Sequence, residues 1–520
     1  MPNKLLLTIL SGLLLGLSWP VSGFAPLLFV GFVPMLWLIN SSKTEHFWRF
    51  FGRIFIGFFI WNAIATWWLW NATVFGMFFA MTVNSVLMAL IVVLWRRVDR
   101  TIGEKTGLIF LPLAWISFEK MHLGWDFSWP WLNLGNGFAA YPNWVQWYEY
   151  TGSFGGALWI WIVNIMVFKV FVRFKKTKNI GRIWIQPVLV ILIPILLSYY
   201  ILFTYKTENN TPINVTVVQP NIDPYTDKYS LTNQELYTEL IALITPELSK
   251  SPHLIVTPET YFSEGAGVFL PTFNQNALYT SMLRFSTDNN TQFLNGIQFY
   301  NTYNEANKTE TANKLKNGIW ADFYNSAFLT DTTARRVYHK SKLVVGVETL
   351  PYRSVIEPLL GNIMLDFGGT LFVRATQKER AAFELYNGDR VGPIICYESI
   401  YGEFVNEYVR KGATVLAIMT NDAWWGNTPG HKQHLAYASL RAIETRRPVV
   451  RSANTGISGF INPLGEIKET LSYNSKGILT VTVIPQTKQT LYVQFGDYIF
   501  RIGAFLCAFI LIFTFARKRN

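Results

Sequence analysis

Long apolar segments constrain this chain more than any other feature of its sequence. A helix needs about twenty mainly apolar residues to cross the roughly 30 Å hydrocarbon layer of a membrane. Segments near that length occur at 4–20, 24–41, 54–72, 76–95, 106–122, 156–174, 183–204 and 497–516. Only 15% of the residues are charged, whereas soluble domains carry about 25%. The sequence therefore predicts a membrane protein with about eight transmembrane helices.

The basic residues between these segments predict the topology. Lys and Arg gather in every second connection, as the positive-inside rule expects of cytoplasmic loops. The connections between them, at 19–23, 71–75 and 122–155, contain neither residue. With the N-terminus in the cytoplasm, an odd number of helices before residue 205 would place the polar stretch that follows outside the cytoplasm. We expect a membrane domain of seven helices over 1–205, an extracytoplasmic domain over 206–485, and a last transmembrane helix within 486–520.

The net charge of +12 follows from the same distribution. A protein that binds nucleic acid gathers its basic residues on one stripe or arm, whereas here they form short clusters between apolar segments. We therefore expect anionic lipid headgroups as partners and no nucleic acid.

The polar stretch 206–485 predicts a mixed α/β sandwich, because short apolar segments alternate with longer amphipathic ones. We expect helices at 233–248, 399–412 and 429–447. Strands are expected at 213–219, 253–258, 293–299, 324–330, 391–397, 414–420, 449–454, 458–462 and 478–483. Two further apolar segments, 261–273 and 358–372, belong either to the core or to lids that face the membrane.

Three short motifs follow predicted strands. TPET contains Glu259, IICYES contains Cys396, and MTNDAWWG contains Asn421 and Asp422. Because ligands bind beyond the carboxyl ends of strands in open α/β sheets, we expect residues at these ends to converge.

Cys396 is a candidate nucleophile. It precedes a helix expected to begin near Ser399, whose dipole would lower the pKa of the thiol. A carboxylate such as Glu259 can accept the thiol proton, and a lysine can stabilise negative charge. Each residue alone also has a structural interpretation: a buried thiol, a helix cap or surface charge, and, for Lys340 and its neighbour Lys342, a surface cation.

Taken together, the motifs resemble the nitrilase superfamily, which uses Glu, Lys and Cys in this order to cleave or form bonds at acyl carbons. The similarity extends to NVTVVQPNI, to YNSAFL and to the long segment that begins NDAWWGNTPGHKQH. With seven helices before this domain and one after it, the whole chain resembles the membrane-embedded branch of that superfamily, the apolipoprotein N-acyltransferases.

The resemblance implies a role for each matching residue. Glu259 would be the general base, Cys396 the nucleophile, and Lys340 the cation that supports the oxyanion. Lys340 matches better than Lys342, because the family's lysine lies two residues after a tyrosine, here Tyr338.

Further positions of the family's site match Glu348, Tyr397 and Glu398, and Tyr229 stands where the family usually has tryptophan. One departure is LVVGVE, where the family often has LVPFGE, so that the loop at 345–347 differs.

The resemblance also implies the reaction. An acyl chain would pass from a membrane phospholipid, through a cysteine thioester, to the N-terminal diacylglyceryl-cysteine of an apolipoprotein, which is the last step of bacterial lipoprotein maturation. No cofactor is implied. We expect a monomer in the bacterial cytoplasmic (inner) membrane, with the catalytic domain on its periplasmic or outer face.

Two other functions fit some of the residues. A membrane-anchored nitrilase-type amidase that hydrolyses a small amide would use the same triad, although it would gain nothing from eight helices. A transporter would need ionisable groups within its helices, which are rare here. His431 and His434 are spaced i,i+3 without partner ligands, so a position on a helix surface is favoured over a metal site.

Overall fold

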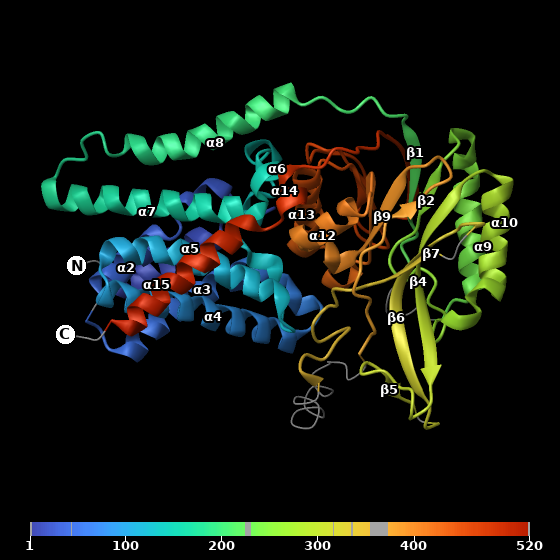
Figure 1. Ribbon diagram of the computed structural model, residues 1–520, viewed down its shortest axis with the longest axis horizontal. Coiled ribbons are helices and arrows are strands. Elements are labelled where there is room, and N and C mark those ends of the chain that lie inside the picture. The colour runs from blue at the N-terminus through green and yellow to red at the C-terminus, as the bar shows by residue number, and fades with distance from the viewer. Residues whose placement is uncertain are drawn as a thin grey trace. The chain divides into compact units, whose positions relative to one another are not determined.

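The computed structural model describes residues 3–42, 44–223, 230–315, 317–333, 336–353 and 373–517. The chain forms two compact units, one of residues 1–205 with 495–520 and one of residues 206–494 (Figure 1). Within the described residues, the first unit is helical and the second contains every strand.

The first unit carries the apolar helices predicted from the sequence. Among the described residues, five helical segments are long and apolar enough to cross a membrane, namely Phe47–Asn71, Val74–Thr101, Ser153–Thr177, Ile185–Thr204 and Tyr498–Ala516. Lys4–Gly16 and Ala25–Ser41 are apolar but shorter. The remaining predicted segment coincides with Glu104–Gly124. The chain is therefore a membrane protein.

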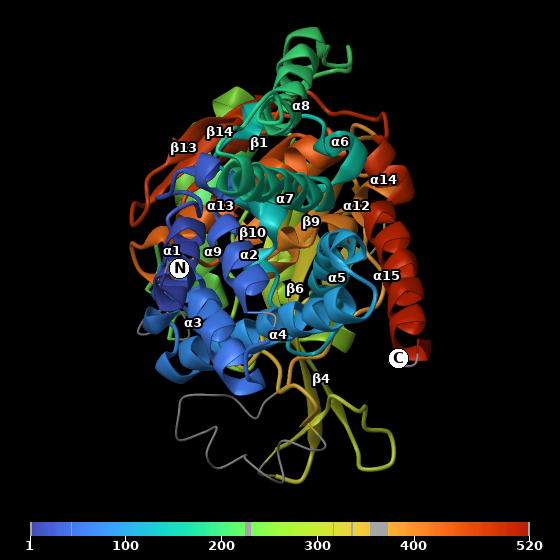
Figure 2. The ribbon, with the colours of Figure 1, turned by 90° about the vertical axis from the view of Figure 1, so that its left-hand side faces the viewer.

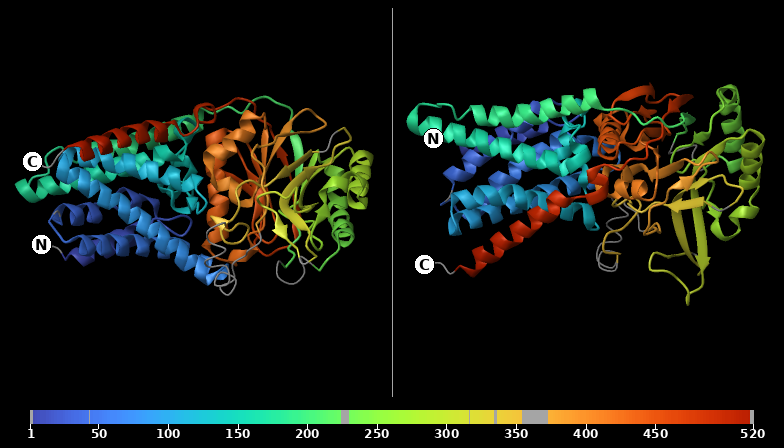
Figure 3. Two further views of the ribbon diagram at one scale, coloured as in Figure 1. Left: turned by 60° about the horizontal axis from the view of Figure 1, so that its bottom comes forward. Right: turned by 45° about the horizontal axis from the view of Figure 1, so that its top comes forward.

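The elements of this unit are α1 (Lys4–Gly16), η1 (Ala25–Phe29), α2 (Val33–Ser41), α3 (Phe47–Thr66), η2 (Trp67–Asn71), α4 (Val74–Thr101), α5 (Glu104–Gly124), η3 (Pro130–Leu132), η4 (Leu134–Phe138), η5 (Pro142–Trp144), α6 (Tyr148–Thr151), α7 (Ser153–Thr177), α8 (Ile185–Thr204) and α15 (Tyr498–Ala516). Neighbouring helices pack in sequence order from α3 to α5, and α15 lies beside α5 (Figure 2). Figure 3 shows α7 and α8 alongside each other.

Aromatic side chains fill the centre of the helical unit. The rings of Phe32 and Trp161 stack at 4.1 Å, and Trp115 meets Trp161 edge-on at 5.3 Å. Asn84 of α4 donates a hydrogen bond to Asn62 of α3 at 2.8 Å. Because lipid tails are as apolar as these side chains, such close packing and polar contacts hold membrane helices together.

The second unit contains two sheets. The strands of the first are, in spatial order, β14 (Gly477–Val483), β1 (Ile213–Gln219), β2 (Leu254–Val256), β4 (Gln292–Tyr303), β6 (Trp320–Leu329) and β5 (Asn313–Lys314), with β3 (Val268–Phe269) on β4 and β7 (Arg336–His339) on β6. The second sheet runs β13 (Ile467–Leu471), β12 (Ser458–Ile461), β11 (Val449–Ala453), β10 (Val415–Thr420), β9 (Arg390–Ile395) and β8 (Phe383–Glu384). Strands β1, β2 and β4 are parallel, as are β9, β10 and β11.

Helices cover the outer side of each sheet, so that the unit has four layers (Figure 1). The helices are α9 (Asn233–Ile244), η6 (Thr245–Lys250), η7 (Leu270–Gln275), α10 (Ala277–Asp288), η8 (Cys396–Ile400), α12 (Gly402–Arg410), η9 (Ala423–Trp425), α13 (Pro429–Thr445) and α14 (Leu491–Phe495).

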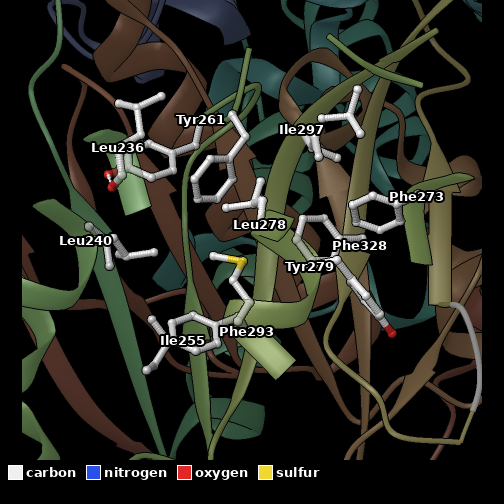
Figure 4. Close-up of a cluster of buried hydrophobic side chains, with 14 of the residues drawn as sticks. Leu236, Leu240, Ile255, Tyr261, Phe273, Leu278, Tyr279, Phe293, Ile297 and Phe328 are labelled. Carbon is white, nitrogen blue, oxygen red and sulfur yellow. Dashed lines mark hydrogen bonds between the residues drawn. The ribbon is translucent and has the colours of Figure 1, made fainter. Parts of the chain in front are cut away.

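Helix α9 begins where Thr232 and Glu235 form a capping box, which satisfies backbone donors of its first turn. Its Leu236 and Leu240, one turn apart, pack with Leu278 of α10 in a buried cluster (Figure 4).

The nine predicted strands coincide with β1, β2, β4, β6, β9, β10, β11, β12 and β14, so the α/β class predicted from the sequence is confirmed. Five strands and α10 were not predicted. Three of these strands have only two residues, and β13 is almost entirely exposed, so it lacks the alternating apolar pattern of a half-buried strand.

The segment 261–273 belongs to the core. Tyr261, Phe262, Val268 and Phe273 are all buried in the cluster that α9 and α10 cover. Of the two predicted alternatives for this segment, core packing is therefore correct and a lid is wrong. The other such segment, 358–372, lies outside the described residues.

Candidate active site

One buried ammonium group organises the candidate site. The Nζ atom of Lys340 lies 2.8 Å from Oε1 of Glu259 and 2.8 Å from Oε2 of Glu348. Lys340 is 1% exposed and each carboxylate residue 8%. Burial alone would lower the pKa of Lys340, but the two carboxylates and the sulfur of Cys396 raise it well above its ordinary value. The ammonium therefore stays charged.

The fold brings these groups together from separate strand ends. Glu259 follows β2 by three positions, Lys340 directly follows β7, and Cys396 directly follows β9 of the second sheet. The backbone N–H of Asn421, which directly follows β10, donates to Oε2 of Glu259 at 3.2 Å. Residues that are far apart in the sequence thus meet beyond the ends of strands.

Asn325 of β6 holds the two carboxylates in place. Its side-chain Nδ2 donates to Glu259 at 2.7 Å and to Glu348 at 2.9 Å, and its backbone carbonyl oxygen accepts from the backbone N–H of Lys340 at 2.8 Å. The YNSAFL segment resembles the family without indicating a function for Asn325. Because β6 also contains the buried polar residues Asp322 and Ser326, a polar residue in this strand did not distinguish Asn325.

Glu348 carries negative charge beside Lys340. Burial favours its neutral form, but the Lys340 and Arg374 cations hold its pKa below the ordinary value. The backbone N–H of Val344 also donates to Glu348 at 2.9 Å. The intervening loop, 345–347, turns at Gly346 with a φ of 78°, a conformation that glycine adopts without strain.

Cys396 occupies a tight turn between β9 and η8. Its φ is 50° and the residue is 7% exposed. A positive φ costs an L-residue roughly 1–2 kcal/mol, so the surrounding contacts must impose the turn. Such a turn lifts a side chain out of the strand, as a nucleophile requires.

The sequence predicted a lowered thiol pKa, and this is wrong for the resting protein. Burial and the Glu259 carboxylate raise the pKa of Cys396 more than the Lys340 cation lowers it. The expected helix is also displaced, because a short 3₁₀ turn, η8, begins at Cys396 itself and α12 begins only at Gly402. The thiol is therefore neutral at rest and needs a base.

Glu398 ties the cysteine turn to the lysine loop. Its Oε1 accepts from the Tyr338 hydroxyl at 2.6 Å and from the Ser341 N–H at 2.7 Å, and its Oε2 accepts from the Ile395 N–H at 2.8 Å and the Tyr408 hydroxyl at 3.0 Å. Burial raises its pKa in spite of these bonds. Glu398 thus holds Ile395, which precedes Cys396, and Ser341, which follows Lys340.

The other predicted residues have different surroundings. Tyr397 is buried, with its ring edge-on to that of Tyr401 at 5.3 Å. Lys342 lies 5.1 Å above the Tyr401 ring and is not among the cations that bridge the carboxylates. Tyr229 lies outside the described residues.

The two histidines of HKQH are buried, so the predicted position on a helix surface is wrong. Both are fully inaccessible, because the small and apolar side chains of α13 bury this helix on nearly every side. His434 contacts Asp422 at 3.1 Å, and His431 contacts Asn427 at 3.2 Å. Within the described residues, no group of three or more His, Cys, Asp or Glu side chains is arranged to hold a metal ion.

The chain belongs to the carbon–nitrogen hydrolase family, whose model matches residues 214–491. A second model, that of the apolipoprotein N-acyltransferase N-terminal domain, matches residues 11–166. The two matches together cover the α/β unit and most of the helical unit.

Similar proteins carry the name apolipoprotein N-acyltransferase. That of Chlorobaculum tepidum is 28% identical over 532 residues, covering 99% of this chain and 97% of its own. That of Haemophilus influenzae is 26% identical over 512 residues, covering 95% and 91%. Among solved structures, an amidase from Nesterenkonia sp. aligns with 13% identity and a TM-score of 0.38, covering 57% of this chain and 98% of that one.

Proposed function

We propose that this protein transfers an acyl chain from a membrane phospholipid to the α-amine of the N-terminal diacylglyceryl-cysteine of apolipoproteins. The observation that carries the proposal is the buried Lys340 ammonium, held between Glu259 and Glu348 beside the thiol of Cys396. The arrangement lies in a chain that matches named acyltransferases over nearly its whole length. The enzyme is an acyltransferase of the carbon–nitrogen hydrolase family.

In the first half-reaction, Glu259 accepts the proton of Cys396 while the sulfur attacks the carbonyl carbon of a phospholipid acyl ester. Lys340 stabilises the negative charge that develops on the carbonyl oxygen. The ester C–O bond then breaks, and Glu259 returns its proton to the departing oxygen. The products are a lysophospholipid and a thioester on Cys396.

In the second half-reaction, the α-amine of the apolipoprotein attacks the thioester carbonyl. Glu259 accepts a proton from the amine nitrogen, the C–S bond breaks, and the sulfur is reprotonated by Glu259. The product is an amide on the lipoprotein, and Cys396 is a neutral thiol again. One carboxyl group thus shuttles the proton in both directions.

The amidase alternative shares this chemistry but not the need for a membrane. We propose that α1, η1 with α2, α3 to α5, α7, α8 and α15 make eight spans, which would hold the α/β unit where lipid substrates arrive. The clusters of Lys and Arg at alternate connections support its placement on the outer face. A phosphatase reporter that folds only outside the cytoplasm, inserted in the exposed loop 304–310, should be active.

Mass spectrometry of the acyl-enzyme tests the function directly. Purified protein incubated with phospholipid should gain one acyl mass on the peptide that contains Cys396, and an apolipopeptide should remove it as an N-acylated product. Cys396→Ala should show no gain, whereas Cys507→Ser should acylate normally, because Cys507 lies in α15 of the helical unit. Acylation of the Cys396→Ala variant, or release of free fatty acid in place of N-acyl product, would overturn the proposal.

A further inference from the structure

The backbone carbonyl and the thiol of Cys396 both contact side chains that take no part in the proposed reaction. The carbonyl oxygen of Cys396 accepts hydrogen bonds from Oγ of Ser399 at 2.8 Å and from Nε2 of His434 at 3.2 Å. At the other end, the thiol has a hydrogen bond with the side chain of Thr420. These partners come from η8, α13 and β10.

Asp422 contacts both Thr420 and His434. Its Oδ1 accepts from the Thr420 hydroxyl at 2.8 Å and lies 3.1 Å from Nδ1 of His434, while its Oδ2 is paired with Arg451. All four residues are fully buried. Although burial opposes ionisation, Arg451 and His434 hold the pKa of Asp422 well below its ordinary value, so the carboxylate is charged and can only accept hydrogen bonds.

The orientation of the imidazole follows from these partners. Nε2 of His434 lies 3.2 Å from the carbonyl oxygen of Cys396 and 2.9 Å from Oγ of Ser399. Nδ1 lies between Asp422 and the Arg451 guanidinium, at 3.1 and 3.3 Å. Asp422, Arg451 and Ser399 therefore fix the ring from both sides.

Holding the Cys396 carbonyl also sets the direction of the next N–H. In a trans peptide the C=O and the following N–H point to opposite sides of one plane. The N–H of Tyr397 must therefore point away from His434. A donor of fixed direction beside the nucleophile is what a developing oxyanion requires.

We propose that Asp422 and His434 form a positioning pair, which holds the Cys396 thiol through Thr420 and the Cys396 carbonyl through the imidazole. The inference rests on the proposed function. The pair touches no reacting atom; it keeps the positive-φ turn, and with it the sulfur and the Tyr397 N–H, in the geometry for attack. A displacement of about 1 Å at such a position costs about a hundredfold in rate.

Variants of single groups separate positioning from mere stability. His434→Gln removes the imidazole, and Thr420→Val removes only the hydroxyl at nearly constant volume. His431→Gln is the matched control, because it removes another buried imidazole one turn earlier on α13 that contacts Asn427 and not Cys396. Each full-length variant is measured for melting temperature, for the rate of acyl-enzyme formation from phospholipid, and for alkylation of Cys396 by iodoacetamide as a function of pH.

We expect a specific result for each of the variants His434→Gln and Thr420→Val. His434→Gln should slow acyl-enzyme formation about a hundredfold but change alkylation by only a few-fold, because alkylation needs no oxyanion donor. Thr420→Val should also slow acyl-enzyme formation, because it removes the hydroxyl that donates to Asp422 and contacts the thiol.

Clear outcomes would overturn the proposal. One is a normal rate of acyl-enzyme formation in a folded His434→Gln variant. Another is a His431→Gln variant whose rate falls as much as that of His434→Gln. If His434→Gln does not fold, Ser399→Ala takes its place, because it removes one of the two donors to the same carbonyl. If Ser399→Ala and Thr420→Val both acylate normally, the positioning pair is refuted. Absence of acylation in the unmodified protein would instead refute the proposed function.

Discussion

Replacing Lys340 by methionine removes the cation that bridges the two carboxylates of the site. Methionine keeps an unbranched side chain of similar length but loses the ammonium that lies 2.8 Å from each of Glu259 and Glu348. Both carboxylate residues are only 8% exposed, so water cannot replace the lost partner. Removing one member of a buried ion pair costs about 3–5 kcal/mol of unfolding free energy.

The sign of the pH dependence follows from the pKa shifts. In the unmodified protein, the raised pKa of Lys340 stabilises the fold at every pH below the ordinary lysine value, and this stabilisation is lost only as pH rises through the raised value. The lowered pKa of Glu348 stabilises the fold above the ordinary glutamate value, and this is lost as pH falls through the lowered value.

In the methionine variant, two neighbouring buried carboxylates have no shared cation. One of them then takes up a proton more readily, because like charges raise each other's pKa. The folded state of the variant binds this proton more tightly than the unfolded chain, so its stability rises as pH falls. The deficit relative to the unmodified protein should therefore be larger at about pH 8 than at about pH 5.

Thermal unfolding of the full-length protein in detergent, followed by tryptophan fluorescence, measures this deficit. We expect a melting temperature lower by roughly 10 °C at about pH 8. Lys342→Met is the matched control, because that lysine is partly exposed and lies over the Tyr401 ring, so its replacement should cost about 1 kcal/mol or less. Equal melting temperatures of the two variants, or a deficit that does not change with pH, would refute the reasoning.

Three further substitutions test single parts of the site. Glu259→Gln keeps the size of the side chain but removes the proton acceptor, so acyl-enzyme formation should fall about a hundred- to ten-thousandfold. The amide nitrogen cannot accept the hydrogen bonds of a carboxylate oxygen, so the unfolding free energy should also fall by about 1–3 kcal/mol. Glu398→Gln leaves one acceptor oxygen for four donors and should lower the unfolding free energy by about 1–3 kcal/mol for each donor left unpaired, measured by thermal unfolding. Gly296→Ala would place a Cβ 2.0 Å from the backbone of 258–260, so acylation should fall about a hundredfold, whereas Gly477→Ala, with its nearest atoms at 3.5 Å, should acylate normally.

The sequence predicted the strand ends well because each motif directly follows an apolar, β-branched segment. The positions of Glu259 and Cys396 after β2 and β9 follow from that pattern alone. Choosing Lys340 over Lys342 needed the resemblance to a known family, since both are flanked by similar residues. Their catalytic roles are proposals that the acylation experiments test.

Contacts between strands could not be predicted in the same way. Asn325 acquires its position because β6 pairs with β4 and places its amide between two carboxylates. No local sequence pattern predicts such a contact. His434 was misjudged for a related reason: α13 is polar in composition, yet its small side chains let neighbouring elements cover it almost completely. Periodicity describes a helix that is half exposed and fails for one that is buried on all sides.

The charges of the site also explain why its cysteine is neutral before it reacts. The carboxylates of Glu259 and Glu348 already face the cations of Lys340 and Arg374, so a permanent thiolate would add an uncompensated negative charge to a buried cluster. Proton transfer to Glu259 must therefore accompany attack by the sulfur. In the proposed reaction, the negative charge then moves from the carboxylate to the carbonyl oxygen beside Lys340, and the thioester that follows is neutral. The buried cluster therefore carries the same charge before and after acylation, and the negative charge on the carbonyl oxygen exists only during transfer.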